Sequence, residues 1–326
     1  MGNFTFGLLA ILFAAFCSSP AFDPEVVLGS WAHDDNAEDT PVIEEPHFTR
    51  TSDFFTSEVR LVYSKKSIWN EGFRSPLPGF HPHPSNQLLT SLVTFLLAMF
   101  AQGERCHAWL YLPRGNSSTP PVVLMAQGLG AQKDFGLHMY AEVFAAAGIA
   151  SYSFDYRTFG GSSGEPRNVI NPWRHIKDYQ AALEHVRTDG LGGRVDPERL
   201  ALWGTSFSGG HVLAAAAEDA GNVTAVVSQM PHLDGRAASR RAMAQRGLLG
   251  TLRIVHAVLK DLGRSFMGLS PACLKIAGKT GELAMMTMSE EQLQKYFAKH
   301  PAEYLGGWVN LVPARAAAMI GLYSPT

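Results

Sequence analysis

The chain has 326 residues and a formal net charge of −2, with basic and acidic side chains scattered along it. A nearly neutral chain without a basic cluster argues against a nucleic-acid partner. The 3 cysteines have no metal-type spacing, so we expect neither a metal site nor a cofactor, and no disulfide framework. The length and the 46% apolar content fit one large α/β domain, or a domain with a substantial cap.

Residues 1–45 are expected to form an extension ahead of the folded core. Phe4 to Cys17 is a continuous apolar run followed by small residues, which is typical of a secretory signal peptide over 1–21. The run is short for a membrane span, and no Lys or Arg precedes Arg50, so the basic start of a signal peptide is missing. The alternatives are an apolar extension that packs on the core and a misplaced start codon. The protein is secreted if 1–21 is a signal peptide and cytoplasmic otherwise.

The folded core is expected over residues 46–232. It opens with a strand and turn over 47–58, which an irregular insertion at 60–102 separates from a second strand over 104–113. The insertion combines a proline-containing loop with an apolar run that has neither helical nor strand period. We therefore expect no regular part of the core within it.

Apolar strands and helical segments then alternate along the chain. The patterns predict strands over 122–126, 149–155, 200–204 and 223–230, and helices over 137–147 and 172–187. Asn171 is the expected N-cap of the second helix, with Pro172 in its first turn. Such alternation predicts an α/β fold, in which a mostly parallel sheet carries helices on both faces.

After Asp234 we expect helices only, over 236–262, 290–297 and 312–322. These helices would form a cap at 233–326, over the edge of the sheet where the parallel strands end. Two stretches of the cap, 248–259 and 283–288, are largely apolar, and Arg253 is the single charged residue in them. Such a roof would suit a hydrophobic acyl chain, although ordinary packing of the cap on the core predicts the same pattern.

The stretch L-A-L-W-G-T-S-F-S-G-G over 200–210 carries the strongest functional signal. An apolar strand leads through small residues to Ser206, and a helical segment follows at once, which is the layout of a nucleophile elbow. Gly204 and Gly209 would leave room for this sharp turn. The motif departs from G-x-S-x-G at its last position, where Ser208 replaces glycine.

A second loop is expected to lie beside the elbow. Gln127-Gly-Leu-Gly130 follows the strand over 122–126, and the ends of parallel strands meet at one edge of a sheet. In an acyl-transfer enzyme the backbone N–H groups of Leu129 and Phe207 would then form an oxyanion hole. The alternative interpretation of this loop is an ordinary tight turn between a strand and a helix.

Three motifs in this order resemble the α/β-hydrolase superfamily: Q-G-x-G at 127–130, D-Y-R-x-F-G-x-S-x-G-E-P from Asp155, and W-G-T-S-F-S-G-G at 203–210. They look most like its small bacterial hydrolases and the fungal polyketide transferases and thiohydrolases of secondary metabolism. The resemblance implies an α/β-hydrolase fold with a serine nucleophile at Ser206. It also implies that the loop of Asp155 and Arg157 is mainly structural.

A serine hydroxyl needs a histidine base, and that histidine needs a carboxylate to orient it. In this superfamily the acid and the histidine follow the serine on two further strands, yet no strand pattern is expected here after Met230. The candidate acid is Asp234 and the candidate base is His232, because both follow the strand over 223–230. Three other histidines could in principle act as the base, but they are expected to be structural: His211, His256 and His300.

The absent last strands and the insertion at 60–102 suggest gene-model faults, a premature end and a retained intron. The sequence predicts a serine-dependent acyl hydrolase or acyltransferase whose substrate is a small-molecule ester or thioester, such as a polyketide or fatty acyl group on a carrier protein. Two alternatives stay open. One is a catalytically inactive descendant that binds an apolar ligand, and the other is a peptidase for small substrates.

Overall fold

The computed structural model describes residues 43–45, 48–57, 103–114, 119–219, 222–298 and 307–325. The predicted signal peptide, the whole predicted insertion at 60–102 and His300 lie outside the described residues. Within these residues, none of the helices combines the length and the apolar content that a membrane crossing requires. They also hold no group of three or more His, Cys, Asp or Glu side chains that could bind a metal ion.

The core is a seven-stranded sheet in the order β1-β2-β3-β5-β4-β6-β7. Its strands are β1 (Ile43–Glu45), β2 (Phe48–Ser57), β3 (Glu104–Pro113), β4 (Val122–Ala126), β5 (Ala150–Phe154), β6 (Leu200–Thr205) and β7 (Ala225–Gln229). From β4 to β7 neighbouring strands are parallel, whereas β1, β2, β3 and β5 pair antiparallel in turn. Only β1 and β3 therefore run against the other strands, which confirms the mostly parallel sheet.

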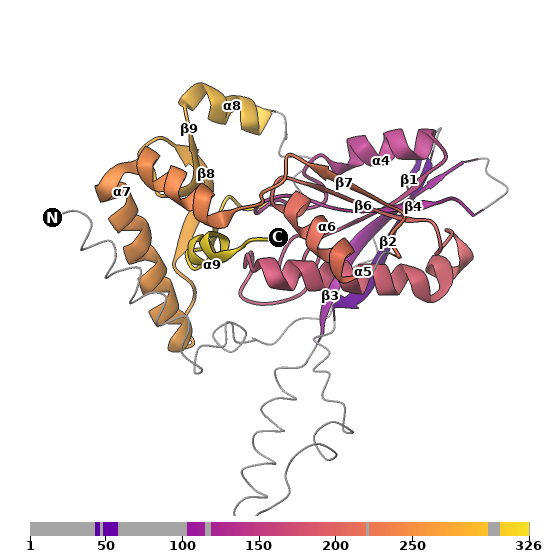
Figure 1. The fold of residues 1–326 in the computed structure, drawn as a ribbon, viewed down its shortest axis with the longest axis horizontal. Coiled ribbons are helices and arrows are strands. Elements are labelled where there is room, and N and C mark those ends of the chain that lie inside the picture. Colours follow the sequence, from indigo (N-terminus) through magenta and orange to yellow (C-terminus); the bar gives the residue numbers. More distant parts are fainter. Residues whose placement is uncertain are drawn as a thin grey trace, which may run out of the picture.

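Helices cover both faces of this sheet (Figure 1). They are α4 (Leu137–Ala146), α5 (Pro172–Gly193) and α6 (Phe207–Glu218), with α4 on one face and the other two side by side on the opposite face. The Asn171 side chain accepts a hydrogen bond from the backbone N–H of Arg174 at 3.2 Å, so the predicted cap of α5 is confirmed. The α/β fold expected from the sequence is thus the observed one.

The segment after Met230 differs from the sequence-based expectation of helices only. It contains α7 (Gly235–Phe266), β8 (Cys273–Lys279), β9 (Ala284–Met288), α8 (Glu290–Ala298), β10 (Val312–Pro313) and α9 (Ala316–Leu322). The three strands form a separate sheet in the order β10-β8-β9, beside α7 and away from the main sheet (Figure 1). The main sheet ends at β7 in the described part of the chain.

The strands of the second sheet were missed because they carry few β-branched side chains and two exposed lysines. Lys275 and Lys279 of β8 point to solvent and form ion pairs with Glu282 and Glu290. On either side of Lys275, Leu274 and Ile276 are buried. The strand therefore depends on pairing and burial in the folded protein more than on its own propensity.

Two buried ion pairs fix the loops at the edge of the main sheet where the parallel strands end. The Asp155 carboxylate accepts the backbone N–H of Lys133 at 2.6 Å and that of Gly161 at 3.0 Å, and it pairs with the Lys133 ammonium. The Arg157 guanidinium donates to Asp178 of α5 at 2.8 Å. These contacts agree with the structural role that the sequence implied for this loop.

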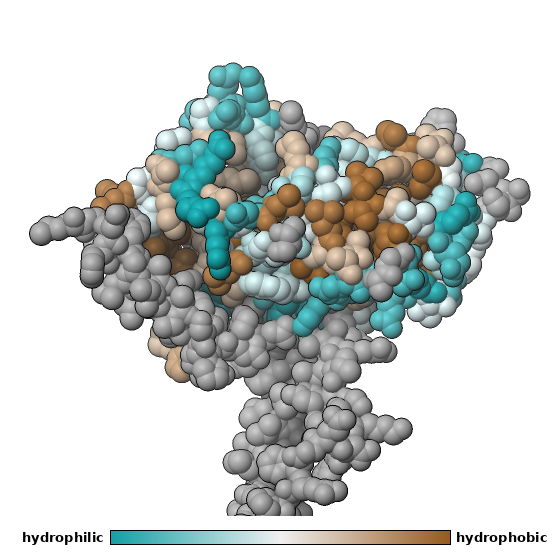
Figure 2. All heavy atoms as spheres, in the orientation of Figure 1, coloured by the Kyte–Doolittle hydropathy of each residue, from teal (hydrophilic) through white to brown (hydrophobic). Residues whose placement is uncertain are grey.

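The last strand of the main sheet is an exposed edge. Val226 and Val227 of β7 are 37% and 46% exposed, and Met230 beyond the strand is 82% exposed. Figure 2 shows hydrophobic surface where Figure 1 places this part of the sheet. The cap does not cover these side chains, since it packs beyond the ends of the parallel strands instead.

Candidate active site

The loops that follow β4, β6 and β7 meet at one edge of the sheet. Ala126 of β4 lies opposite Gly204 of β6, and Thr205 lies opposite Gln229 of β7. This register places Gln127, Ser206 and Met230 at the starts of three adjacent loops, where parallel α/β sheets usually bind their ligands. The site is therefore assembled by strand pairing between segments far apart in the sequence.

Ser206 stands at a sharp turn between β6 and α6. Its backbone has φ 57° and ψ −117°, a conformation that L residues adopt only under strain. A Cβ atom on Gly204 would collide with the Ser208 carbonyl oxygen, so only glycine fits at that position. A Cβ atom on Gly209 would lie only 3.0 Å from the Pro231 Cα atom, so this position is also crowded. The turn leaves Ser206 exposed at the N-terminus of α6.

The loop after β4 presses against this serine. A Cβ on Gly128 would lie 3.0 Å from the Ser206 Cβ and 3.5 Å from its Oγ. The loop is held from the other side by the Trp308 indole N–H, which donates to the Gly130 carbonyl at 2.8 Å. Among the described residues the backbone N–H groups of Leu129 and Phe207 have no hydrogen-bond partner. Both are therefore available to an oxyanion near Ser206, and the Phe207 N–H also lies at the positive end of α6.

Ser206 opens into a cavity of about 280 Å³ between the core and the cap. The core contributes Leu129, Ser206, Phe207 and His232 to its walls. The cap side comes from α7, β9 and α9, and its side chains are mostly apolar: Ala238, Ala242, Met243, Ile254, Val255, Met285, Met286, Ala317 and Ile320. The cavity is thus a small, largely apolar chamber with a serine at its base, as substrate sites commonly are.

His232 lines the same cavity and is held close to the serine through the backbone. Its N–H donates to the Ser206 carbonyl at 2.8 Å, and its ring lies against Phe207 at 5.4 Å between centroids. The Nε2 atom is buried without a hydrogen-bond partner in the described part of the chain. Burial lowers the pKa of His232, and the charge of Asp234 opposes this shift. No hydrogen bond joins His232 to the Ser206 Oγ among the described residues.

Asp234 has a structural role at the start of α7, which the sequence analysis did not predict. It is the N-cap of α7, and its carboxylate accepts the backbone N–H of Ala237 at 2.8 Å. This hydrogen bond lowers the pKa of Asp234, and the residue is exposed. The described structure contains no hydrogen bond from Asp234 to His232. The carboxylate therefore influences the candidate base by its charge and does not orient the ring.

The other histidines lie apart from the cavity. His211 is fully buried beneath Phe207, and its Nδ1 is 2.8 Å from the Tyr323 hydroxyl. Its burial lowers the pKa well below the ordinary value. His256 is exposed on α7. Neither ring lines the cavity that contains Ser206.

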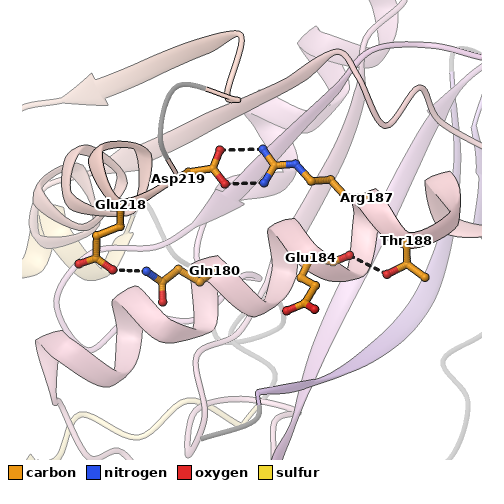
Figure 3. A pocket seen from close by; sticks show the side chains of 6 residues that line it. All are labelled: Gln180, Glu184, Arg187, Thr188, Glu218 and Asp219. Carbon is orange, nitrogen blue, oxygen red and sulfur yellow. Dashed lines mark hydrogen bonds and ion pairs between the residues drawn. The ribbon is translucent and has the colours of Figure 1, made fainter. Parts of the chain in front are cut away.

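A second hollow, of about 430 Å³, lies between α5 and α6 (Figure 3). Its polar side chains bind one another: Arg187 forms a two-pronged ion pair with Asp219, and Gln180 donates to Glu218. Asp219 and Ser206 lie at opposite ends of α6, roughly 20 Å apart by helical rise. This hollow is therefore separate from the candidate active site.

Three polar residues of the cavity were missed: Ser239, Arg246 and Thr251 of α7. The charged one is Arg246, which lies just before the stretch 248–259 for which the sequence predicted an apolar roof. Its Nη2 donates to the Ala284 carbonyl of β9 at 2.8 Å. The sequence offered no signal for this placement, because several arginines are spread along α7 and only the packing of α7 on β9 selects one of them.

Comparison with known proteins agrees with the α/β fold. The family model for X-Pro dipeptidyl-peptidase (S15 family) matches residues 102–264. The quorum-quenching protein AidA of Acinetobacter baumannii is 38% identical over 221 residues, which cover 68% of this chain and 69% of AidA. The thiohydrolase aneE of Aspergillus aculeatus is 35% identical over 132 residues, 40% of this chain and 39% of its own length.

A solved structure of similar fold is the α/β hydrolase GrgF from Penicillium sp. sh18. It matches with a TM-score of 0.53 and 24% identity, over 68% of this chain and 70% of GrgF. At this identity the likeness concerns the fold alone. The comparison thus shows that the fold of this chain is that of a known α/β hydrolase.

Proposed function

Because this chain belongs to the X-Pro dipeptidyl-peptidase (S15) family of α/β hydrolases, we propose that it is a serine acyl hydrolase or acyltransferase for an ester or thioester. The observation that carries the proposal is the strained Ser206 turn, which opens into a largely apolar cavity next to two free backbone N–H groups. The relative named as a thiohydrolase supports a thioester among the substrates.

In the proposed reaction the Ser206 Oγ attacks the carbonyl carbon, and its proton passes to Nε2 of His232. The Leu129 and Phe207 N–H groups donate to the oxyanion of the tetrahedral intermediate. Collapse of this intermediate expels an alcohol or thiol, which takes the proton from His232, and leaves an acyl group on Ser206. Water then completes a hydrolysis, whereas an acceptor alcohol completes a transfer. Asp234 would favour the charged imidazolium only through its negative charge.

Three model substrates test this proposal on the purified chain. We expect release of thiol from the S-hexanoyl thioester of N-acetylcysteamine and of nitrophenol from 4-nitrophenyl hexanoate. Alanyl-proline 4-nitroanilide is the peptidase control, chosen because the family description names X-Pro cleavage. Cleavage of the anilide alone would assign the site to a peptidase. A folded protein that cleaves none of the three would favour the apolar-ligand binder.

The pH dependence gives a further prediction. Only neutral His232 can accept the serine proton, and burial lowers the pKa of His232 below its ordinary value of 6.5. Activity should therefore be fully present above pH 6.5 and be lost as the pH falls through the lowered pKa. The measurement is kcat/KM for 4-nitrophenyl hexanoate against pH, with His232→Gln as the variant that removes the base. An acid limb with its midpoint above 6.5 would contradict this assignment.

A further inference from the structure

A cation is built into the roof of the Ser206 cavity. Arg246 lines the cavity from α7 and is neither fully buried nor fully exposed. Its Nη2 donates to the carbonyl oxygens of Ala284 and Met285, so β9 holds the side chain in place. Its Nε is buried and has no hydrogen-bond partner among the described residues.

This guanidinium also has no counter-ion in the described part of the chain. The fully buried arginines do: Arg157 pairs with Asp178 at 2.7 Å, and Arg315 pairs with Asp261 at 2.7 Å. Burial lowers the pKa of Arg246, and no nearby carboxylate offsets that effect. Withdrawing a cation from water is unfavourable unless an anion or several hydrogen bonds compensate for it. The Arg246 guanidinium would therefore be stabilised by an anion that enters the cavity.

We propose that Arg246 binds a carboxylate on the acyl group of the substrate while the carbonyl carbon of that group lies at Ser206. This inference rests on the proposed acyl-transfer function and narrows its substrate class to ω-carboxy acyl esters or thioesters. The other walls of the cavity agree with such a molecule. Met243, Ile254 and Met286 offer apolar surface for methylene groups, whereas Arg246 offers donors for a charge-assisted hydrogen bond.

A purely structural role for Arg246 makes a different prediction. If the side chain only ties α7 to β9, its replacement would affect neutral and anionic substrates alike. If it binds a carboxylate, replacement would reduce turnover of the anionic substrate selectively. The ratio of the two rates separates these roles, because a general loosening of the cap cancels in the ratio.

The test compares esters whose acyl chains have equal length. Mono-4-nitrophenyl adipate carries a terminal carboxylate, and 4-nitrophenyl hexanoate does not. We expect wild-type kcat/KM to favour the adipate by about tenfold or more, as one charge-assisted contact would give. Arg246→Met should abolish this preference, and Arg246→Lys should keep part of it. Arg253→Met is the matched control, because Arg253 is exposed on the same helix outside the cavity and its loss should leave the preference intact.

Four-carbon and eight-carbon pairs are measured as well, so that one unsuitable chain length does not decide the result. Absence of preference at every length, with the neutral esters still hydrolysed, would overturn the role of Arg246 and leave the proposed function standing. A preference that persists in Arg246→Met would overturn it too.

If no ester is hydrolysed, the proposed function fails and binding tests Arg246 separately. Calorimetry then compares suberate with its dimethyl ester on the folded wild type and on Arg246→Met. Tighter binding of suberate that depends on Arg246 supports the anion site, and equal binding of the two compounds overturns it.

Discussion

Replacement of Ser206 by alanine should remove fluorophosphonate labelling of the folded protein and lower kcat/KM for thioester hydrolysis by roughly 10³-fold or more. Without the Oγ atom at the turn, neither the probe nor an acyl group can form a covalent bond with the enzyme at this position. The two backbone N–H groups beside it remain in the variant, so a small residual rate above the uncatalysed reaction is expected. The measurements are gel fluorescence of the labelled protein and the rate of thiol release.

Ser239→Ala is the matched control for this experiment. Ser239 lines the same cavity but lies on α7 and outside the strained turn, so its loss should leave labelling intact. Equal labelling of Ser206→Ala and wild type would place the nucleophile elsewhere. A folded wild type that takes no label would have the turn and the two N–H groups without a working base. That outcome would favour the inactive descendant and would also remove His232 from its proposed role.

The core could be predicted from the sequence because its signals are local. Every residue from Val122 to Ala126 is buried, so this strand appears as an unbroken apolar run. Asn171 and Pro172 mark the start of α5 by the same residue types that satisfy a helix end physically. The turn at Ser206 was recognisable for a related reason: the tight backbone excludes a side chain at Gly204 and leaves little room at Gly209, so glycines stand close to the serine on both sides.

The cap could not be predicted to the same depth, because its sheet and its polar contacts are tertiary. Gly247 has φ 69° and interrupts the long helical pattern of α7, which bends the helix within the stretch that lines the cavity. Arg246 stands directly before that bend. Which arginine of α7 lines the cavity is decided by the bend and by the carbonyl groups of β9, neither of which has a signature in the local sequence. The role of Asp234 could not be decided from the sequence, because an N-cap and a catalytic acid use the same side chain.

Acidification from pH 7 to pH 4 should destabilise the fold through its buried histidines. Burial lowers the pKa of His175 to about 4, and burial together with the Lys133 ammonium lowers the pKa of His107 to about 4. In the unfolded chain both rings have ordinary values near 6.5, so below that pH the unfolded state binds more protons. Their stabilising contribution is complete above pH 6.5 and is lost as the pH falls towards 4. Each ring should account for about 3 kcal/mol of this loss.

His175→Phe isolates one of these contributions. The His175 ring stacks on Tyr156 at 4.0 Å and lies edge-on to Phe207, so an aromatic replacement keeps the packing while it removes the titrating group. The measurement is the free energy of unfolding by urea at pH 7.0 and 4.5. The variant should lose about 2 to 3 kcal/mol less than the wild type over this range, whatever its stability at pH 7. His256→Gln, which removes an exposed ring, should follow the wild type. An unchanged pH dependence in His175→Phe would mean that the buried ring is protonated as readily as in the unfolded chain.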